Sequence, residues 1–229
     1  IVDILIFLLI VIVVLYYCKN IDTRAYHEGF TQKEPFSLKE NNEIYDNFYT
    51  SVYNDLFKSN SRSQFEYEQI INVTQPSNSS VILDVGSGTG HLMNKFDKEG
   101  YNIHGLEKSK SMIQQSITKF PKLTIHEGDA LDPMVFENGT FTHICCMDFT
   151  VYHINNKRKF IRNCYNWLLP NGYLILHLVN KNKYDTTVPS ANSSEYNPQE
   201  LSKERIKKTH IDFIDFDYLH KVDIKNDNR

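Results

Sequence analysis

The chain has 229 residues, a formal net charge of -3 and 41% hydrophobic residues, enough for one ordinary domain with a packed core. Its acids and bases are well mixed, and no stripe of Lys and Arg with interleaved aromatic residues occurs, so we expect no nucleic-acid partner. The four cysteines stand at spacings that fit no metal site, so we expect neither zinc nor disulfides. The oligomeric state stays open.

Residues 1–18, IVDILIFLLIVIVVLYYC, form an apolar run whose only charge is Asp3. The run falls just short of the ~20 residues that span a bilayer, and a chain that starts at Ile1 suggests missing upstream residues. A secretory signal peptide is the alternative, but Tyr16-Tyr17-Cys18-Lys19 does not resemble a cleavage site. We predict a transmembrane signal anchor of a single-pass membrane protein. The basic residues that follow, Lys19, Arg24 and Lys33, predict that the remaining chain faces the cytosol.

Two helical patterns follow a polar tether at residues 19–42. The first carries one apolar face and an adjacent stripe of tyrosines, and its members are Ile44, Phe48, Val52 and Leu56, then Tyr45, Tyr49 and Tyr53. The second runs from Phe65 to Val73 and ends at a Pro- and Ser-rich turn. We assign residues 43–76 to an N-terminal helical segment and residues 77–229 to the core domain.

In the core domain, strand patterns alternate with helix patterns. Strands are expected at 81–85, 101–107, 123–129 and 141–147, and a turn at Pro170-Asn171-Gly172 is expected to lead into a further strand that ends at 179. Helices are expected at 91–100, 109–120 and 157–169. The inward residues expected on the first and last of these helices are Leu92, Met93 and Phe96, then Phe160, Ile161, Cys164 and Leu168. Alternation of this kind predicts an α/β fold with a doubly wound, mostly parallel sheet, whose ligand site lies at the carboxyl ends of the strands.

The C-terminal part is polar after residue 180 until alternation resumes at residues 211–218, where we expect one more strand. The last strand of the sheet is then missing, and we expect the chain to be truncated at its C-terminus. A sheet left in this state has an open edge and a tendency to aggregate.

A glycine-rich turn, Asp84-Val85-Gly86-Ser87-Gly88-Thr89-Gly90, follows the first strand of the core. Its third glycine comes one residue too early for the dinucleotide fingerprint, and His91 stands where that glycine should be. The Gly-Lys-Ser/Thr ending of a phosphate-binding P-loop is also absent. Glycines still let a ligand approach the backbone, and the next helix offers free N–H groups to a carboxylate.

Acidic residues end the next two strands as well, with Glu107 in IHGLEKS and Asp129 in EGDA. Together with the glycine turn, this order resembles the class I S-adenosylmethionine-dependent methyltransferases over roughly residues 43–179. The resemblance implies that Gly86, Ser87, Gly88 and Gly90 lie under the methionine and ribose part of the cofactor. It also implies that Asp84 orients the cofactor's amino end, that Glu107 accepts from the ribose hydroxyls, and that Asp129 with Ala130 contacts adenine. A loop or capping acid is the alternative for each carboxylate taken alone.

In the same family, the fourth strand is where cofactor and acceptor meet. The resemblance implies that Met147 and Asp148 line the methionine side, and that Tyr152 and His153 face the acceptor. His153 is a candidate general base, and a structural histidine is the alternative. Lys108 flanks the pocket, unless it is a solvated surface residue. Tyr45 and Tyr53 resemble part of a lid over the cofactor, with core packing as the alternative.

The resemblance implies a methyltransferase (EC 2.1.1.-) that moves a methyl group from S-adenosyl-L-methionine to an unidentified small molecule or protein side chain. Methyl transfer from a sulfonium is an in-line displacement that depends on alignment and desolvation and does not require a metal. A catalytically inactive cofactor-binding or interaction module on the same fold is the alternative. An oxidoreductase or epimerase is disfavoured by the glycine spacing.

Overall fold

The computed structural model describes residues 39, 41–57, 60–180, 184–187, 198–212 and 217–222. The signal anchor predicted for residues 1–18 lies outside these ranges, as does most of the predicted tether. Within the described ranges, every helix is too short or too polar to cross a membrane.

Helices and strands follow one another along the chain, with two short helices, α6 and α8, that the sequence patterns did not predict. In chain order, the elements are η1 (Asn41–Ile44), α2 (Asn47–Phe57), α3 (Asn60–Thr74), β1 (Val81–Val85), α4 (His91–Lys98), β2 (Asn102–Glu107), α5 (Lys110–Lys119), β3 (Thr124–Glu127), β4 (Phe141–Cys146), α6 (Thr150–His153), α7 (Lys157–Trp167), β5 (Leu168–Leu176), α8 (Pro198–Leu201), β6 (Lys208–Asp212) and β7 (Asp217–Lys221).

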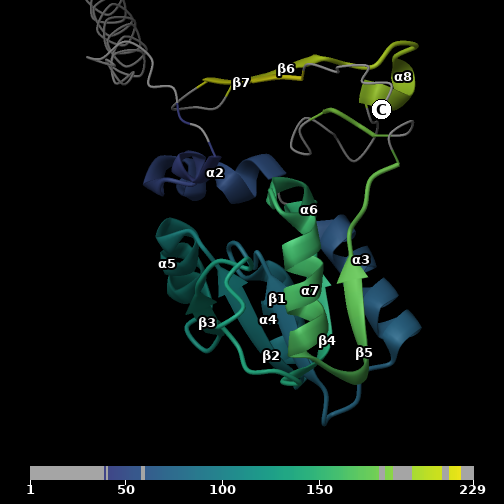
Figure 1. Cartoon of the computed structure of the whole chain (residues 1–229). Coiled ribbons are helices and arrows are strands. Elements are labelled where there is room, and N and C mark those ends of the chain that lie inside the picture. Colours follow the sequence, from purple (N-terminus) through teal and green to yellow (C-terminus); the bar gives the residue numbers. More distant parts are fainter. Residues whose placement is uncertain are drawn as a thin grey trace, which may run out of the picture. The chain divides into compact units, whose positions relative to one another are not determined.

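A five-stranded sheet of order β3-β2-β1-β4-β5 lies at the centre of the unit formed by residues 39–206 (Figure 1). Every pair of neighbours in it is parallel. The doubly wound α/β fold is therefore confirmed. The chain leaves β1 toward β2 on one side and reaches β4 on the other, so the carboxyl ends of β1, β2 and β4 share one edge, where ligands bind in such sheets.

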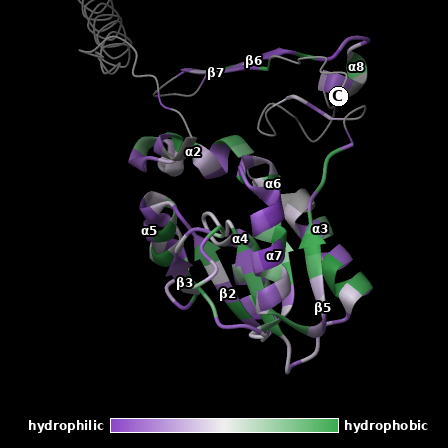
Figure 2. Ribbon diagram, viewed as in Figure 1, coloured by the Kyte–Doolittle hydropathy of each residue, from purple (hydrophilic) through white to green (hydrophobic). Residues whose placement is uncertain are grey.

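Helices cover both faces of the sheet (Figure 2), and the central strands β1 and β4 are buried along almost their whole length. Alternate residues of β1 enter different clusters: Leu83 and Val85 pack toward α7, whereas Ile82 packs with residues of α3 and α4. The pattern repeats on β4, where Cys146 joins the α7 side and Cys145 the other. The period of two along each strand thus builds two core layers around one sheet.

Two helices turn a different face inward than their sequence patterns predicted. On α7, Ile161 is 46% exposed, while Asn163 and Trp167 are buried with Phe160 and Cys164. Buried Asn163 is tolerated because its amide donates to the carbonyl of Ala130 at 2.9 Å. On α2, Phe48 is 58% exposed and Thr50 is buried. Hydrophobicity alone therefore misplaced one residue on each helix.

The strand β5 begins at Leu168, directly after α7, and earlier than the turn at Pro170-Asn171-Gly172 suggested. This turn forms an irregularity inside the strand, with Asn171 at φ 66° and a register shift against β4. A Cβ on Gly172 would lie 2.9 Å from the carbonyl oxygen of Thr142. The backbones of β4 and β5 approach each other closely at this point, and β5 continues through residues that are typical of a turn.

A second unit contains the antiparallel hairpin β6-β7, which pairs from Lys208 with Lys221 to Asp212 with Asp217. The sequence predicted a single strand at 211–218, and this is wrong: two strands meet within that range. Alternation cannot separate one strand from two successive strands that keep the same period. The described residues hold seven strands, five in the sheet and two in the hairpin, where six were predicted.

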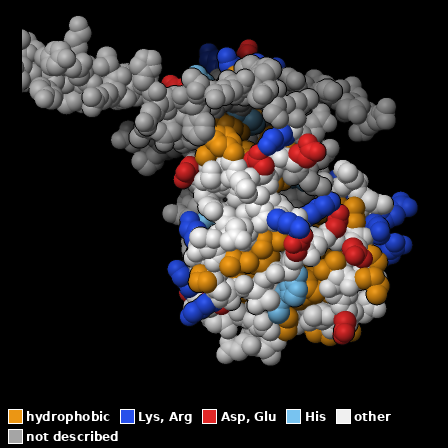
Figure 3. Space-filling model, turned by 90° about the vertical axis from the view of Figure 1, so that its left-hand side faces the viewer, with side chains coloured by type: hydrophobic (Ala, Val, Ile, Leu, Met, Phe, Trp, Pro, Cys, Tyr) orange, Lys and Arg blue, Asp and Glu red, His pale blue; other side chains and the backbone are white. Residues whose placement is uncertain are grey.

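Charged side chains of both signs lie interspersed on the face shown in Figure 3, with apolar side chains between them. The three described cysteines, Cys145, Cys146 and Cys164, are buried and unbridged. Burial is the main cause that raises the pKa of Cys146 and of Cys164 to about 12, so these thiols stay protonated at neutral pH.

Candidate functional site

The glycine turn after β1 uses left-handed backbone at all three of its glycines, with φ of 71° at Gly86, 54° at Gly88 and 76° at Gly90. A Cβ on Gly86 would lie 2.4 Å from Cγ2 of Thr150, and one on Gly90 would lie 2.2 Å from Oγ of Ser116. Gly88 differs, because its nearest neighbour would be a backbone oxygen at 4.0 Å. Two glycines are required for internal packing, and the third leaves open space above the turn.

Glu107, the last residue of β2, holds this turn in place. Its Oε2 accepts the N–H of Gly88 at 2.9 Å, and its Oε1 accepts the N–H groups of Lys108 and Ser109, each at 2.8 Å. The N–H of Gly86 donates to the Leu106 carbonyl at 2.7 Å. A carboxylate has about four acceptor positions and these three N–H groups occupy three of them, so about one position is left for a hydroxyl donor. The role of Glu107 as the ribose ligand stays a prediction.

Asp84 is 4% exposed, and no hydrogen bond joins its carboxyl to another described residue. Burial, followed by the charges of Asp148, Glu107 and Glu66, raises the pKa of Asp84 to about 8. A buried carboxyl without a donor is costly, so a native structure requires a reason for it. A bound cation at this carboxyl would remove the cost.

Asp129 follows β3 at the same edge of the sheet. Its Oδ1 accepts the N–H of Leu131 at 2.9 Å, and its Oδ2 pairs with Nζ of Lys108 at 2.8 Å. Burial alone would raise the pKa of Asp129, but these two donors outweigh it and hold the pKa below its ordinary value. Lys108 thus contacts the predicted adenine ligand directly, and Ala130 beside it is buried.

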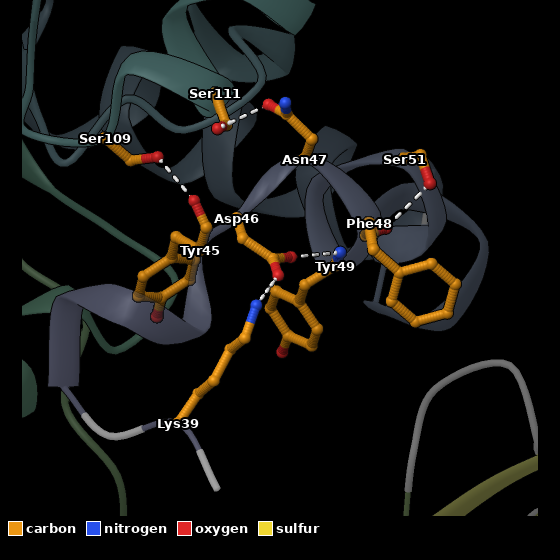
Figure 4. Close-up of polar contacts among 9 residues, drawn as sticks. All are labelled: Lys39, Tyr45, Asp46, Asn47, Phe48, Tyr49, Ser51, Ser109 and Ser111. Atoms are coloured by element: carbon orange, nitrogen blue, oxygen red, sulfur yellow. Dashed lines mark hydrogen bonds and ion pairs between the residues drawn. The ribbon is translucent and has the colours of Figure 1, made fainter. Parts of the chain in front are cut away.

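The N-terminal helical segment docks on this edge through α5, as Figure 4 shows. Oγ of Ser109 donates to the Tyr45 carbonyl at 3.0 Å, and Oγ of Ser111 donates to the side-chain oxygen of Asn47 at 2.8 Å. Asp46 begins α2 by accepting the Tyr49 N–H at 2.8 Å, and it also pairs with Lys39. The start of α2 is therefore tied to the turn that follows Glu107.

The same segment also reaches the glycine turn, because Oγ1 of Thr89 donates to the side-chain oxygen of Asn54 at 2.8 Å. Burial, and then the charge of Glu107, raises the pKa of Tyr45. Tyr45, Tyr49 and Tyr53 form a ladder of edge contacts with ring centroids 5.8 and 5.9 Å apart. Tyr45 lies near the predicted ribose ligand, whereas Tyr53 stacks along this ladder within the N-terminal segment.

The turn after β4 contains two consecutive left-handed residues that are not glycine, Asp148 at φ 48° and Phe149 at φ 61°. Asp148 is close enough to Asp84 for its charge to raise that pKa. Met147 is partly buried against the α3 and α4 side of the core. Left-handed backbone at side chains other than glycine costs about 1–3 kcal/mol each and is commonly found at functional sites.

The two residues predicted to face the acceptor lie on α6. Tyr152 is 46% exposed, and its hydroxyl oxygen accepts the N–H of Val179 at 3.0 Å, so it joins α6 to the segment after β5. His153 is exposed, and none of the described contacts brings it to the buried acids. The role of His153 as a base therefore stays a prediction, as does the alternative of a structural histidine.

Two residues that the sequence patterns did not indicate meet at this edge instead. Nδ1 of His177, directly after β5, lies 3.0 Å from Oε1 of Glu66 on α3, and the side chain of Glu66 is 8% exposed. Ligand-type atoms of Glu66, Asp148 and His177 all lie within 4.8 Å of one another. Glu66 lies in α3, where charged and apolar residues are mixed, so its position in the sequence did not indicate a site. The predicted strand ended at residue 179, so His177 was placed inside the strand and not directly after it.

The described residues suit the cofactor that the sequence resemblance implied. Asp84 offers an unpaired buried carboxyl, Gly88 offers open space, and the hydroxyl of Ser87 is buried without a hydrogen bond to a described residue. These features match an ammonium group, a flat ligand passing over the turn, and a further polar contact. When bound, S-adenosyl-L-methionine supplies a methyl group on a positively charged sulfur.

Comparison with known proteins agrees with the geometry. Residues 83–176 match the family described as "Methyltransferase domain". The chain is 28% identical over 148 residues to dTDP-4-amino-2,3,4,6-tetradeoxy-D-glucose N,N-dimethyltransferase from Saccharopolyspora spinosa, covering 61% of this chain and 58% of that protein. It is 28% identical over 105 residues to ubiquinone biosynthesis O-methyltransferase from Vibrio parahaemolyticus, covering 44% of each.

A solved structure from Methanococcus maripaludis, titled a putative S-adenosyl-L-methionine-dependent methyltransferase, superimposes with a TM-score of 0.52 at 20% identity. It covers 61% of this chain and 67% of that one, and it supports the fold. The chain spans about half the length of the curated relatives it matches. The fold and the site define a Rossmann-like nucleoside-binding domain. The chain contains a class I S-adenosylmethionine-dependent methyltransferase domain, and its cofactor is S-adenosyl-L-methionine.

Proposed function

We propose that this chain transfers a methyl group from S-adenosyl-L-methionine to a small molecule that binds at the carboxyl ends of β4 and β5. One observation supports this most: three acids lie at or next to the carboxyl ends of three adjacent strands, and Glu107 also fixes the open glycine turn. Asp84 orients the cofactor's amino end, Glu107 accepts from the ribose and Asp129 from the adenine amine. Curated relatives include both N- and O-methyltransferases by name, so their names do not choose the acceptor atom.

In this proposal, the protein aligns the cofactor with the acceptor and excludes water from the site. The Tyr45 end of α2 covers the ribose side through its contact with Ser109, and Asn54 holds the glycine turn from above. An acceptor atom must meet the methyl carbon in line with the bond to sulfur, so a fixed cofactor is a large part of catalysis. No observation on the described residues favours the alternative of an inactive binding module.

Calorimetric titration with S-adenosylmethionine and its demethylated product tests this proposal. We expect Glu107→Ala to weaken binding by at least about tenfold, because it removes charge-assisted acceptors and releases Gly88. Glu127→Gln is the matched control: Glu127 pairs in register beside Glu107 but is exposed and meets only Lys110, at 3.6 Å, among the described ion pairs. Folded protein that binds neither compound would refute the proposal, and binding without transfer of labelled methyl to a cell extract would favour the inactive module.

We also propose, from the sequence of residues 1–18, that the domain is anchored to a membrane and faces the cytosol. The test is alkaline extraction of membranes from cells that express the full chain. Retention in the pellet is expected, with release after deletion of residues 1–18. Full release of the intact chain by alkaline buffer would refute the anchor.

A further inference from the structure

The side chains of Glu66, Asp148 and His177 form a cluster, which we call the acceptor cluster, at the carboxyl ends of β4 and β5. Asp148 follows β4, His177 follows β5, and Glu66 reaches the same place from α3. The N–H of His177 donates to the Cys146 carbonyl at 3.0 Å, so the two strand ends are held side by side. The cluster therefore combines three distant parts of the sequence.

The acceptor cluster lies next to the methionine end of the cofactor site. The charges of Asp148 and of Glu66 both act on buried Asp84, the carboxyl assigned to the cofactor's amino end. Asp84 itself lacks a hydrogen-bond donor among the described residues and is 4% exposed. The carboxylates of Asp148 and Glu66 thus bring negative charge close to Asp84, which suits a cationic group of the acceptor beside the cofactor.

Aromatic rings line the same cluster. The Phe149 ring lies 4.1 Å from the His177 ring between centroids, and the Tyr184 ring meets Phe149 edge-on at 5.9 Å. Ring faces attract organic ammonium groups, and carboxylates pair with them. A divalent cation could use the same three ligand atoms, but unlike an ammonium group it would gain nothing from the rings.

Resting on the proposed function, we infer that the methyl acceptor is an amine, held as its ammonium form by Asp148 and Glu66 against Phe149. His177, oriented by Glu66, takes one proton from the ammonium group. The nitrogen lone pair then forms the N–C bond to the methyl carbon, and the C–S bond breaks with its electron pair left on sulfur. The products are the N-methylated amine, protonated on nitrogen, and the neutral thioether, with one proton passed to His177.

The test uses the full chain, methyl-labelled cofactor and a small-molecule cell extract, divided into an untreated half and a half whose amines have been acetylated. We expect label to enter the fraction that binds a cation exchanger, and acetylation to lower this transfer by about tenfold or more. Transfer that survives acetylation would overturn the amine, and so would transfer that needs a divalent cation and stops with a chelator. Binding of cofactor with no transfer at all would count against the proposed function and against this inference with it.

Variants localise the effect. We expect Asp148→Asn and Glu66→Gln each to lower transfer by about tenfold or more, and we expect Glu66→Gln to leave the calorimetric affinity for S-adenosylmethionine within about threefold. Asp148→Asn should act through KM and His177→Gln through kcat, because only the second removes a proton acceptor. Glu68→Gln is the matched control on α3, since Glu68 is exposed and accepts only from Gln64 among the described contacts. Unchanged transfer in both acid variants would refute the acceptor cluster.

Discussion

The turns after β1 and after β4 lie at the same edge of the sheet, and both need left-handed backbone, yet they are built from different residues. The first uses Gly86, Gly88 and Gly90, which adopt positive φ without strain. The second uses Asp148 and Phe149, which are strained by it. The turn after β1 lacks side chains at its glycines, which leaves its backbone accessible to a ligand at Gly88, whereas the turn after β4 keeps a carboxylate and a ring in place despite the strain.

The largest expected effect on this comparison comes from Gly90→Ala. The new Cβ would lie 2.2 Å from Oγ of fully buried Ser116, in backbone that an L side chain rarely adopts. We expect a loss of about 3 kcal/mol in the free energy of unfolding, measured by denaturant titration. Gly100→Ala is the control, since Gly100 has φ of 84° but open space around it, and it should cost about 1 kcal/mol. Equal losses in the two variants would show that packing beneath the turn is unimportant.

Gly88→Ala separates binding from stability. Its Cβ would enter open space, so the folded protein should lose only about 1 kcal/mol from the backbone. The same methyl group would occupy the space through which the cofactor passes, and we expect affinity for S-adenosylmethionine to fall by about tenfold or more in calorimetry. Affinity within twofold of the original would mean that the cofactor does not pass over Gly88.

Asp148→Gly gives the turn after β4 a glycine at a left-handed position, as in the turn after β1. Glycine accepts φ of 48° without strain, so the protein should gain about 1 kcal/mol in thermal or denaturant unfolding. Methyl transfer should be lost, because the carboxylate of the acceptor cluster is gone. Asp148→Asn keeps the local backbone preference and should leave stability nearly unchanged. A destabilised glycine variant would show that the Asp148 side chain contributes more to the fold than its backbone costs.

The smallest expected effect is a proton released on cofactor binding. The pKa of Asp84 is raised to about 8, so the carboxyl is mostly protonated at pH 7 before a cation binds. Pairing with the cofactor's ammonium favours the ionised form, and up to about one proton should leave at pH 7. Calorimetry in buffers of different ionisation enthalpy measures this proton. Release that persists in Asp84→Asn would assign it to another group.

The same raised pKa has a consequence for the protein without cofactor. The folded state binds this proton more tightly than the unfolded chain, so stability from Asp84 is full below the ordinary carboxyl pKa and is lost as the pH rises through about 8. Unfolding measured across this range should show the decline, and Asp84→Asn should flatten it. A decline of equal slope in both proteins would contradict the linkage.

Sequence patterns predicted the parts of the site that are local to one turn. The glycines and the acids Asp84, Glu107 and Asp129 were expected at strand ends, and the structure brings them to one edge. The contact between Glu66 and His177 was not predicted, because it joins a helix before the sheet to the end of its last parallel strand. No periodicity or spacing reports such a pair, since it arises only when both segments pack.

The same division between predicted local features and unpredicted long-range contacts holds for the fold. Five parallel strands followed from alternation of strand and helix patterns, whereas the inward face of α7 did not. Asn163 is buried there because it has a carbonyl partner in the loop after β3, and Ile161 stays outside. A hydrophobicity pattern carries no information about a distant hydrogen-bond acceptor, so errors fall where a polar side chain has found one.

The rates at which the buried thiols on β4 react can report how the two core layers of the sheet separate. Cys145 belongs to the core layer of α3 and α4, and Cys146 to that of α7. Both stay protonated and shielded while the sheet is closed, so an alkylating reagent reaches each only when its own layer separates. Equal rates of alkylation at the two neighbours would mean that both layers come apart in one cooperative event, and unequal rates would show which layer loosens first.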